Sequence, residues 1–398
     1  MNAIFKYIRK NWFELLVTLF VLSNLFPTFT SRYFYSLAWL LIGYKMAKNK
    51  VYLNRDASWF IFLMVFICIT SMINLVVSSK IMMFFVILIL TCPIYTSLNW
   101  HIYKKNLMRF LSYGFVAVTL INLYAYFIGF NLRAMYQQWE DLTDKQFSGF
   151  CDQPMWLSAA AAVSSIFCAY NIFSQQKKTK KQLLLHIILL IISIYITMIA
   201  GSRAAFIACM AAILILLYIL VKSKVKLIKY IVIIGLAVWA LSPWMLDRET
   251  TGAMMAKQEH QEDIGKTSRD ELWAQRMAEY KSSPLIGVGF AAHGVGDETE
   301  VSGVEYGGGW ISILSQMGIL GAIIVLFINL RVLTSLKRIR RDEFMAYIYA
   351  LYFFFCAHSI VEGYMFQSGW YICLVFWLVT GLLIENKQYG KLIKVDNG

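Results

Sequence analysis

Residues 183–221 read LLLHIILLIISIYITMIAGSRAAFIACMAAILILLYILV, which is two long apolar runs separated by the short turn Gly201-Ser202-Arg203. Each run is about as long as the ~20-residue helix that crosses the hydrocarbon core of a bilayer. Continuous apolar runs of this length exclude the short alternating strands of a membrane barrel. The stretch therefore predicts a pair of antiparallel transmembrane helices in an all-α membrane protein.

The composition of the whole chain agrees with this class. Of the 398 residues, 59% are hydrophobic and 15% are charged, and the mean hydropathy is +0.59. A water-soluble globule of this size needs more polar surface than such a chain provides. The net charge of +14 would suggest nucleic acid for a soluble protein, but here the basic residues cluster between apolar runs, so no nucleic-acid partner is expected.

Similar apolar runs recur along the chain and predict about twelve transmembrane helices in all. They cover residues 12–29, 33–47, 57–77, 81–98, 110–130, 154–172, 183–200, 204–221, 230–246, 310–331, 344–361 and 368–384. Neither an internal repeat nor an appended soluble domain is found, so residues 1–398 are interpreted as a single membrane domain.

The basic residues predict the orientation of these helices. With a cytoplasmic N-terminus, most of the 37 lysine and arginine residues fall on the cytoplasmic side, in clusters such as 177–181, 222–229 and 331–341. The positive-inside rule therefore predicts a multi-pass protein of the cell inner membrane with both termini in the cytoplasm.

Two loops on the predicted periplasmic side are much longer than the others, a smaller one at 131–153 and a larger one at 247–309. Loops of such length in a compact bundle often carry function. In the smaller loop, Arg133 and Trp139 are candidate sugar-contacting residues, because aromatic faces pack on sugar rings. The larger loop is the main candidate for the functional region.

A short amphipathic helix is predicted within the larger loop, over residues 268–281. Ser268 and Glu271 have the spacing of a capping box, and Pro284 prevents the helix from continuing. The apolar side chains of this helix are expected to lie on the mouth of the bundle; they are Trp273, Met277 and Tyr280.

Arginines on the predicted periplasmic side are candidate ligands of an anionic group. Arg203 opens a helix, where backbone N–H groups and a guanidinium together form a phosphate site, or else it anchors the helix at the lipid headgroups. Arg269 and Arg276 share nearly one face of the loop helix and are placed to hold one anion together, or else they pair with neighbouring carboxylates.

Other polar residues give weaker indications. His293 is on the periplasmic side but not at metal-ligand spacing from another histidine, so neither a metal site nor another cofactor is predicted. Glu305 belongs to a group of acidic residues that provides either a general base or a solvated surface.

Segments of this region together resemble the O-antigen ligase and polymerase family. They are residues 201–206 (GSRAAF), Arg269-x-x-x-Trp273, residues 283–290 (SPLIGVGF) and residues 314–321 (LSQMGILG). The resemblance extends over about residues 195–325. It implies a many-helix membrane glycosyltransferase with a large periplasmic loop that acts on glycans linked to undecaprenyl pyrophosphate.

The resemblance also implies roles for individual residues. Arg203 and Arg269 match two recurrent periplasmic arginines of the family, and Arg276 with Gly287 fits an arginine-to-glycine spacing of O-antigen polymerases. Guanidinium groups that neutralise the leaving pyrophosphate make a metal-independent transfer feasible. Arg203, Arg269 and Arg276 are therefore expected at the catalytic site, and Trp273 and Gly287 at the substrate-binding site.

One departure from the family concerns the acceptor-activating base. Ligases carry a His-Asn pair shortly before the glycine at 318, whereas this chain has Gly307 and Gly308 there. The departure favours a polymerase that transfers an undecaprenyl-pyrophosphate-linked glycan to a lipid-linked repeat unit. Glu305 or His293 is then the expected base.

Other functions stay open at this point. A ligase would use lipid A core as the acceptor, and a chain-length regulator is a candidate partner of the polymerase. A flippase or other transporter would need charged or broken helices at the midplane of the membrane, which is almost free of charge here. A non-enzymatic scaffold would not require arginines at a helix mouth.

Overall fold

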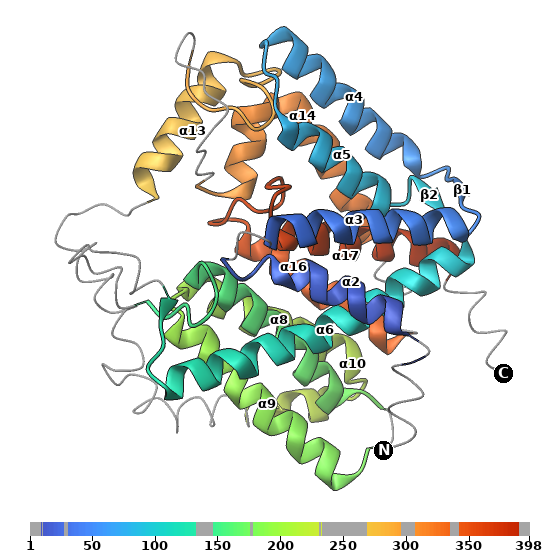
Figure 1. Ribbon diagram of the computed structural model, residues 1–398, viewed down its shortest axis with the longest axis vertical. Coiled ribbons are helices and arrows are strands. Elements are labelled where there is room, and N and C mark those ends of the chain that lie inside the picture. Colours follow the sequence, from blue (N-terminus) through green and yellow to red (C-terminus); the bar gives the residue numbers. More distant parts are fainter. Residues whose placement is uncertain are drawn as a thin grey trace.

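The protein was analysed as a computed structural model, which describes residues 9, 11–27, 31–132, 146–175, 178–230, 232, 269–295, 307–334 and 342–389. Helices dominate the described residues (Figure 1). In chain order they are α2 (Trp12–Ser23), α3 (Ser31–Lys48), α4 (Ala57–Ile73), α5 (Ser79–Thr91), α6 (Leu98–Phe127), α8 (Pro154–Phe173), α9 (Lys180–Ile199), α10 (Arg203–Leu220), α13 (Asp270–Ser282), α14 (Gly309–Leu333), α16 (Glu343–His358) and α17 (Tyr371–Tyr389).

The predicted all-α membrane class is confirmed. Among the described residues, five helices are long and apolar enough to cross a membrane, namely α6, α8, α9, α10 and α14. The other predicted apolar segments also overlap helices, except 230–246, which lies outside the described residues apart from 230 and 232. The total of about twelve spans therefore stays a prediction.

The β structure of the described residues consists of one short pair of strands. Strand β1 (Tyr52–Leu53) pairs antiparallel with β2 (Tyr95–Thr96), with Tyr52 opposite Thr96. The pair ties the connection before α4 to the connection between α5 and α6. It lies far from α13, on the opposite side of the molecule (Figure 1).

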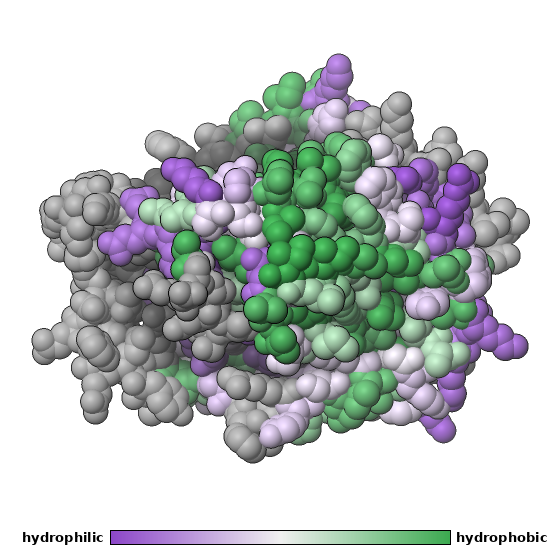
Figure 2. All heavy atoms as spheres, turned by 90° about the horizontal axis from the view of Figure 1, so that it is seen from above, coloured by the Kyte–Doolittle hydropathy of each residue, from purple (hydrophilic) through white to green (hydrophobic). Residues whose placement is uncertain are grey.

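The surface has an apolar belt between two polar ends. Figure 2 shows a continuous hydrophobic area across the middle of one face, with hydrophilic residues on either side of it. On α4 the exposed apolar side chains include Ile61, Phe62, Val65 and Ile69. Contiguous exposed apolar surface is what a helix presents to lipid, so the belt marks the part that lies in the membrane.

One end of the bundle collects helix termini that bear polar side chains, and we call it the site end. Helix α8 begins there at Pro154, α10 at Arg203 and α17 at Tyr371, while α16 ends there at His358. Helix α10 packs against both α8 and α16. The Tyr371 hydroxyl donates to the Trp156 carbonyl at 3.0 Å, which joins the start of α17 to the start of α8.

The opposite end is held by ion pairs, among them Arg331 with Asp56 at 2.9 Å and Lys105 with Asp342 at 2.8 Å. A further group is fully buried there. The Glu385 carboxylate accepts from Lys104 at 2.5 Å and contacts His101 Nδ1 at 2.9 Å. Breaking one member of such a buried pair strands the other charge, so this group fixes α17 against α6.

Candidate active site

Helix α14 is broken at Gly318, and this break organises the loop that precedes it. Gly318 has φ 60° and ψ −167°, which interrupts the helical backbone and leaves peptide groups without helical partners. The segment 284–291 of the larger loop supplies those partners. Ile319 N donates to Pro284 O at 2.9 Å, and Val288 N donates to Ser315 O at 2.9 Å.

Glycines allow the two backbones to approach this closely. A Cβ atom on Gly287 would lie 2.3 Å from the Gln316 carbonyl carbon, and one on Gly318 would lie 2.4 Å from the Leu285 carbonyl carbon. Both residues also have positive φ values. The segments 283–290 and 314–321, which carry the family resemblance, therefore pack directly on each other.

Helix α13 was predicted at 268–281 and is observed at Asp270–Ser282, packed against α14 (Figure 1). Its N-cap is Arg269, without a side-chain cap, whereas the predicted cap Ser268 lies outside the described residues. The expected orientation of the helix was wrong. Trp273 and Met277 are each 36% exposed, while the buried side chains are Arg276 and Glu279.

The burial of Arg276 has a direct structural cause. Its Nη1 donates to Glu279 Oε2 at 2.8 Å, and the side chains are 1% and 0% exposed. The second carboxylate oxygen of Glu279 accepts from Gly294 N at 2.9 Å. The pair therefore attaches α13 to Gly294, just after the segment 284–291 that fills the break in α14.

Trp273 fastens the other end of the loop to α13. Its indole Nε1 donates to the Gly307 carbonyl at 2.9 Å. Immediately afterwards, Gly309 N donates to the carbonyls of Ser359 at 2.7 Å and Glu362 at 3.1 Å. A Cβ atom on Gly308 would lie 2.5 Å from the Ile360 carbonyl oxygen. The glycines before α14 thus let the chain lie flat against residues 359–362.

Arg269 reaches across to the segment that follows α16. Its Nη2 donates to Glu362 Oε1 at 2.8 Å, and the two side chains are 22% and 13% exposed. This pair is partly open to solvent, unlike the pair between Arg276 and Glu279. A charged ligand can therefore approach the Arg269 guanidinium.

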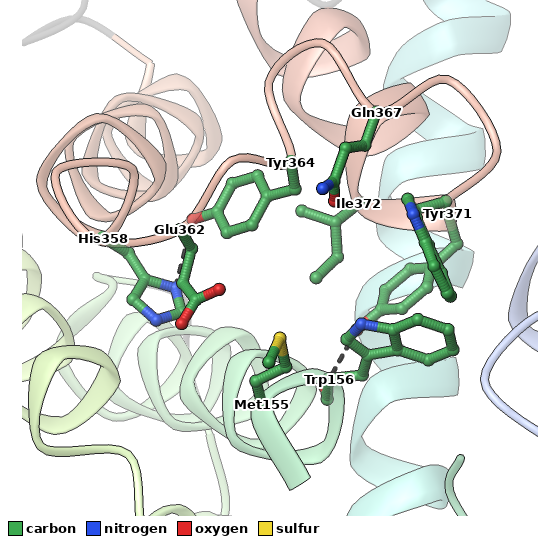
Figure 3. A pocket seen from close by; sticks show the side chains of 9 residues that line it. Met155, Trp156, His358, Glu362, Tyr364, Gln367, Tyr371 and Ile372 are labelled. Atoms are coloured by element: carbon green, nitrogen blue, oxygen red, sulfur yellow. Dashed lines mark hydrogen bonds between the residues drawn. The ribbon is translucent and has the colours of Figure 1, made fainter. Parts of the chain in front are cut away.

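The Glu362 carboxylate lines a pocket at the site end, shown in Figure 3. The space not filled by protein atoms is about 310 Å³, and this volume includes open solvent at the mouth of the pocket. Its walls are Met155, Trp156, His358, Glu362, Tyr364, Gln367, Trp370, Tyr371 and Ile372. They come from the start of α8, the end of α16, the segment 359–370 and the start of α17. Aromatic rings thus face a carboxylate and an imidazole across one cavity.

His358 stands beside Glu362 in this wall (Figure 3). Its side chain is buried, Nδ1 lies 3.1 Å from the Tyr364 hydroxyl, and Nε2 has no hydrogen-bond partner. Burial raises the pKa of Tyr364 well above its usual range, so the phenol stays protonated. The unsatisfied Nε2 is a position at which a bound hydroxyl group gains a hydrogen bond.

Arg203 is the first residue of α10, at the site end. Gly201 turns the chain with φ +76°, and the Ser202 hydroxyl accepts from Ala205 N at 3.3 Å, which caps the helix. Arg203 is half-buried. Because α10 runs antiparallel to α16, Arg203 lies at the same end of the bundle as His358.

The remaining expected site residues divide into two groups. Arg133, Trp139 and Glu305 lie outside the described residues, so their roles stay predictions. His293 is half-buried in the segment that follows Phe290, and it is not among the residues that line the pocket. Gly287 lies within the packed interface with α14.

His358 and Glu362 were not predicted as site residues from the sequence. A usable signal exists, because a histidine and a carboxylate stand four residues apart where an apolar run ends on the predicted periplasmic side. That signal gives no indication of Arg269, which only the tertiary fold brings to Glu362.

Comparison with known proteins agrees with the resemblance. Residues 188–326 match the family described as O-antigen ligase. The match covers α9 from residue 188, all of α10 and α13, the segment 284–291 and the break in α14. No curated protein matches the chain. The matched segment thus contains Arg203, Arg269 and Arg276 together with the interlocked backbone of the site end, and over these residues the chain is similar to the O-antigen ligase family.

Proposed function

We propose that the protein is a surface-polysaccharide polymerase, which transfers a glycan from undecaprenyl pyrophosphate to a lipid-linked repeat unit on the periplasmic face of the inner membrane. The observation that carries the proposal is the position of Arg269. Its guanidinium pairs with Glu362, a residue of the aromatic-lined pocket, at the end of the bundle where Arg203 opens α10.

The chemistry of the transfer accounts for these residues. The departing lipid pyrophosphate gains negative charge as the bond to the anomeric carbon breaks. Guanidinium groups bind phosphate oxygens in pairs, and a helix N-terminus adds N–H donors. Arg203 and Arg269 therefore hold the pyrophosphate and stabilise it as a leaving group without a metal ion or a nucleotide sugar.

Arg276 has a different part in the proposal. A side chain that is 1% exposed and paired with Glu279 would have to leave that pair to touch pyrophosphate. Its contribution is therefore to position α13, and with it Arg269. Trp273 and Gly287 likewise shape the site through Gly307 and α14. Arg133 and Trp139 are proposed to contact sugar from the smaller loop.

A ligase is the second candidate, because the matching family is described as O-antigen ligase. It would use the same donor but lipid A core as the acceptor. The polymerase is favoured by Gly307 and Gly308, which stand where ligases carry their His-Asn pair. A chain-length regulator is proposed as the partner that sets the size of the polymer.

Genetic complementation tests the proposal. The gene is deleted in the native host and restored as wild type, Arg203→Ala, Arg269→Ala or Arg331→Ala, and surface glycan ladders are compared at matched membrane levels of protein. For a polymerase, deletion and the first two variants leave lipid A core capped by a single repeat unit. Arg331→Ala, at the exposed pair of the opposite end, keeps the wild-type ladder.

Two results would change the assignment. If no repeat reaches lipid A core while long lipid-linked chains accumulate, the protein is the ligase. A normal ladder after deletion contradicts both activities.

A further inference from the structure

We infer that Glu362 is the general base of this transfer, and that Arg269 holds its carboxylate inactive until the pyrophosphate of the donor takes over the guanidinium. The inference rests on the proposed function. It adds a residue outside the segment that matches the family, which ends at 326.

The position of Glu362 satisfies the geometric requirement for a base. The carboxylate projects into the pocket beside His358 (Figure 3), and its side chain is 13% exposed. The carbonyl of the same residue accepts from Gly309 N at 3.1 Å, which fixes the backbone against α14. A carboxylate held on such a rigid segment can receive a proton from a hydroxyl group bound in the pocket.

The aromatic residues of the pocket wall indicate which kind of molecule bears that hydroxyl group. The Trp156 and Trp370 rings have centroids 3.5 Å apart, and Tyr371 is tied to Trp156 by its hydroxyl at 3.0 Å. Flat apolar faces next to polar groups are the surface on which the C–H face of a sugar ring packs. We therefore assign the open mouth of the pocket to the terminal sugar of the acceptor, with one of its hydroxyl groups entering the pocket, where the unsatisfied His358 Nε2 is a hydrogen-bond site.

The pair with Arg269 explains why Glu362 is inactive in the absence of donor. A guanidinium 2.8 Å away stabilises the charged carboxylate and so weakens it as a proton acceptor. Pyrophosphate carries more negative charge than one carboxylate and offers oxygens for bidentate binding. Donor binding therefore moves Arg269 from Glu362 to phosphate, and one exchange both binds the leaving group and activates the base.

The resulting step is a single displacement. The acceptor hydroxyl transfers its proton to the Glu362 carboxylate, and its oxygen forms the bond to the anomeric carbon of the donor glycan. The bond from that carbon to the pyrophosphate oxygen breaks, and its electron pair leaves on lipid pyrophosphate. Attack from the face opposite the leaving group inverts the anomeric configuration.

The experiment separates binding from transfer in the purified full-length protein in lipid nanodiscs. Binding is measured with undecaprenyl pyrophosphate itself, and transfer with the lipid-linked repeat unit extracted from the deletion strain. Glu362→Gln should bind undecaprenyl pyrophosphate at least as tightly as wild type, because Arg269 loses its competitor. Its transfer rate should fall by about 10²–10⁴-fold.

Matched variants complete the design. Arg269→Ala should weaken undecaprenyl pyrophosphate binding, whereas Asp56→Asn, which breaks the pair with Arg331 at the opposite end, should change neither quantity. Glu362→Asp keeps a carboxylate and should restore part of the transfer rate. A monodisperse elution profile from size exclusion checks that each variant is folded.

The outcomes distinguish this inference from the function on which it rests. If Glu362→Gln transfers at the wild-type rate, or if the product retains the donor configuration, Glu362 is not the base although the polymerase assignment stands. If Glu362→Gln binds undecaprenyl pyrophosphate more weakly than wild type, the exchange of Arg269 is wrong. Absence of any transfer by wild-type protein instead counts against the proposed function.

Discussion

Arginine–carboxylate pairs of the same length have different consequences because their burial differs. Arg276 and Glu279 are 1% and 0% exposed, Arg269 and Glu362 are 22% and 13% exposed, and Arg331 and Asp56 are 42% and 27% exposed. A surface pair contributes about 0–1 kcal/mol, whereas breaking a buried pair costs about 3–5 kcal/mol. The intermediate pair is the one that a ligand can open.

Glu279→Gln should therefore destabilise the protein strongly. The substitution removes the charge opposite buried Arg276 and weakens the acceptor for Gly294 N, so a loss of about 3–5 kcal/mol is expected. Thermal unfolding in detergent measures the effect. Asp56→Asn is the control and should change stability by about 0–1 kcal/mol. Equal midpoints for the two variants would show that the buried pair is not needed.

Sequence alone could not assign these roles. The spacing of Arg276 and Glu279 allows an ion pair on any exposed helix, and the apolar Trp273 and Met277 suggested that their own side of α13 is buried. The structure buries the charged side instead, because Glu279 also binds the backbone of the loop. Such a preference depends on a partner segment, which helix periodicity does not contain.

At the level of elements, the break in α14 and the segment 284–291 form one unit. The apolar run over 310–331 predicted one helix, and its bounds were close to those observed. The break at Gly318 was not predicted, because glycine also occurs in regular membrane helices. Its positive φ becomes favourable when another backbone satisfies the exposed peptide groups.

Gly287→Ala tests the importance of that interface. The side chain would meet the backbone of Gln316 at 2.3 Å in addition to the unfavourable φ of +72°. Gly129→Ala is a matched control, since Gly129 has φ +69° with nothing within 4 Å. The control should lose about 1–2 kcal/mol from backbone strain. Gly287→Ala should lose about 1–3 kcal/mol more from the clash.

The folded fraction of each variant after membrane extraction, followed by thermal unfolding, provides the comparison. Equal stability of the two alanine variants would mean that the segment 284–291 moves away from α14 at little cost.

At the scale of the whole molecule, hydropathy predicted the positions of the apolar helices but not the residues of the site. The helices are recognisable one at a time, because the length of an apolar run depends on the thickness of the membrane rather than on neighbours. The pocket joins residues 155 and 362, and Glu362 in turn pairs with Arg269; no local pattern connects these three residues. The arginines were predicted from the family resemblance, whereas Glu362 and His358 were identified only from the packing of the helices in three dimensions.

The orientation of the bundle is testable with fusions to compartment-specific reporters. The apolar belt separates the site end from the opposite end, where Lys105 and Arg331 form ion pairs. The positive-inside rule places that opposite end in the cytoplasm. Green fluorescent protein fused after the C-terminus should fluoresce. Alkaline phosphatase inserted at a position within residues 261–268 should be active. The reverse pattern would place the pocket in the cytoplasm and exclude a periplasmic donor.

The broken helix α14 also bears on biosynthesis. Its open peptide groups are filled by residues 284–291, which precede the helix in the chain and therefore leave the ribosome before Gly318 does. A discontinuous helix in lipid needs such a complement at once. Membrane insertion can thus proceed from the N-terminus to the C-terminus. The segment 284–291 reaches the translocon before α14 and can bind its open peptide groups before α16 and α17 are synthesised.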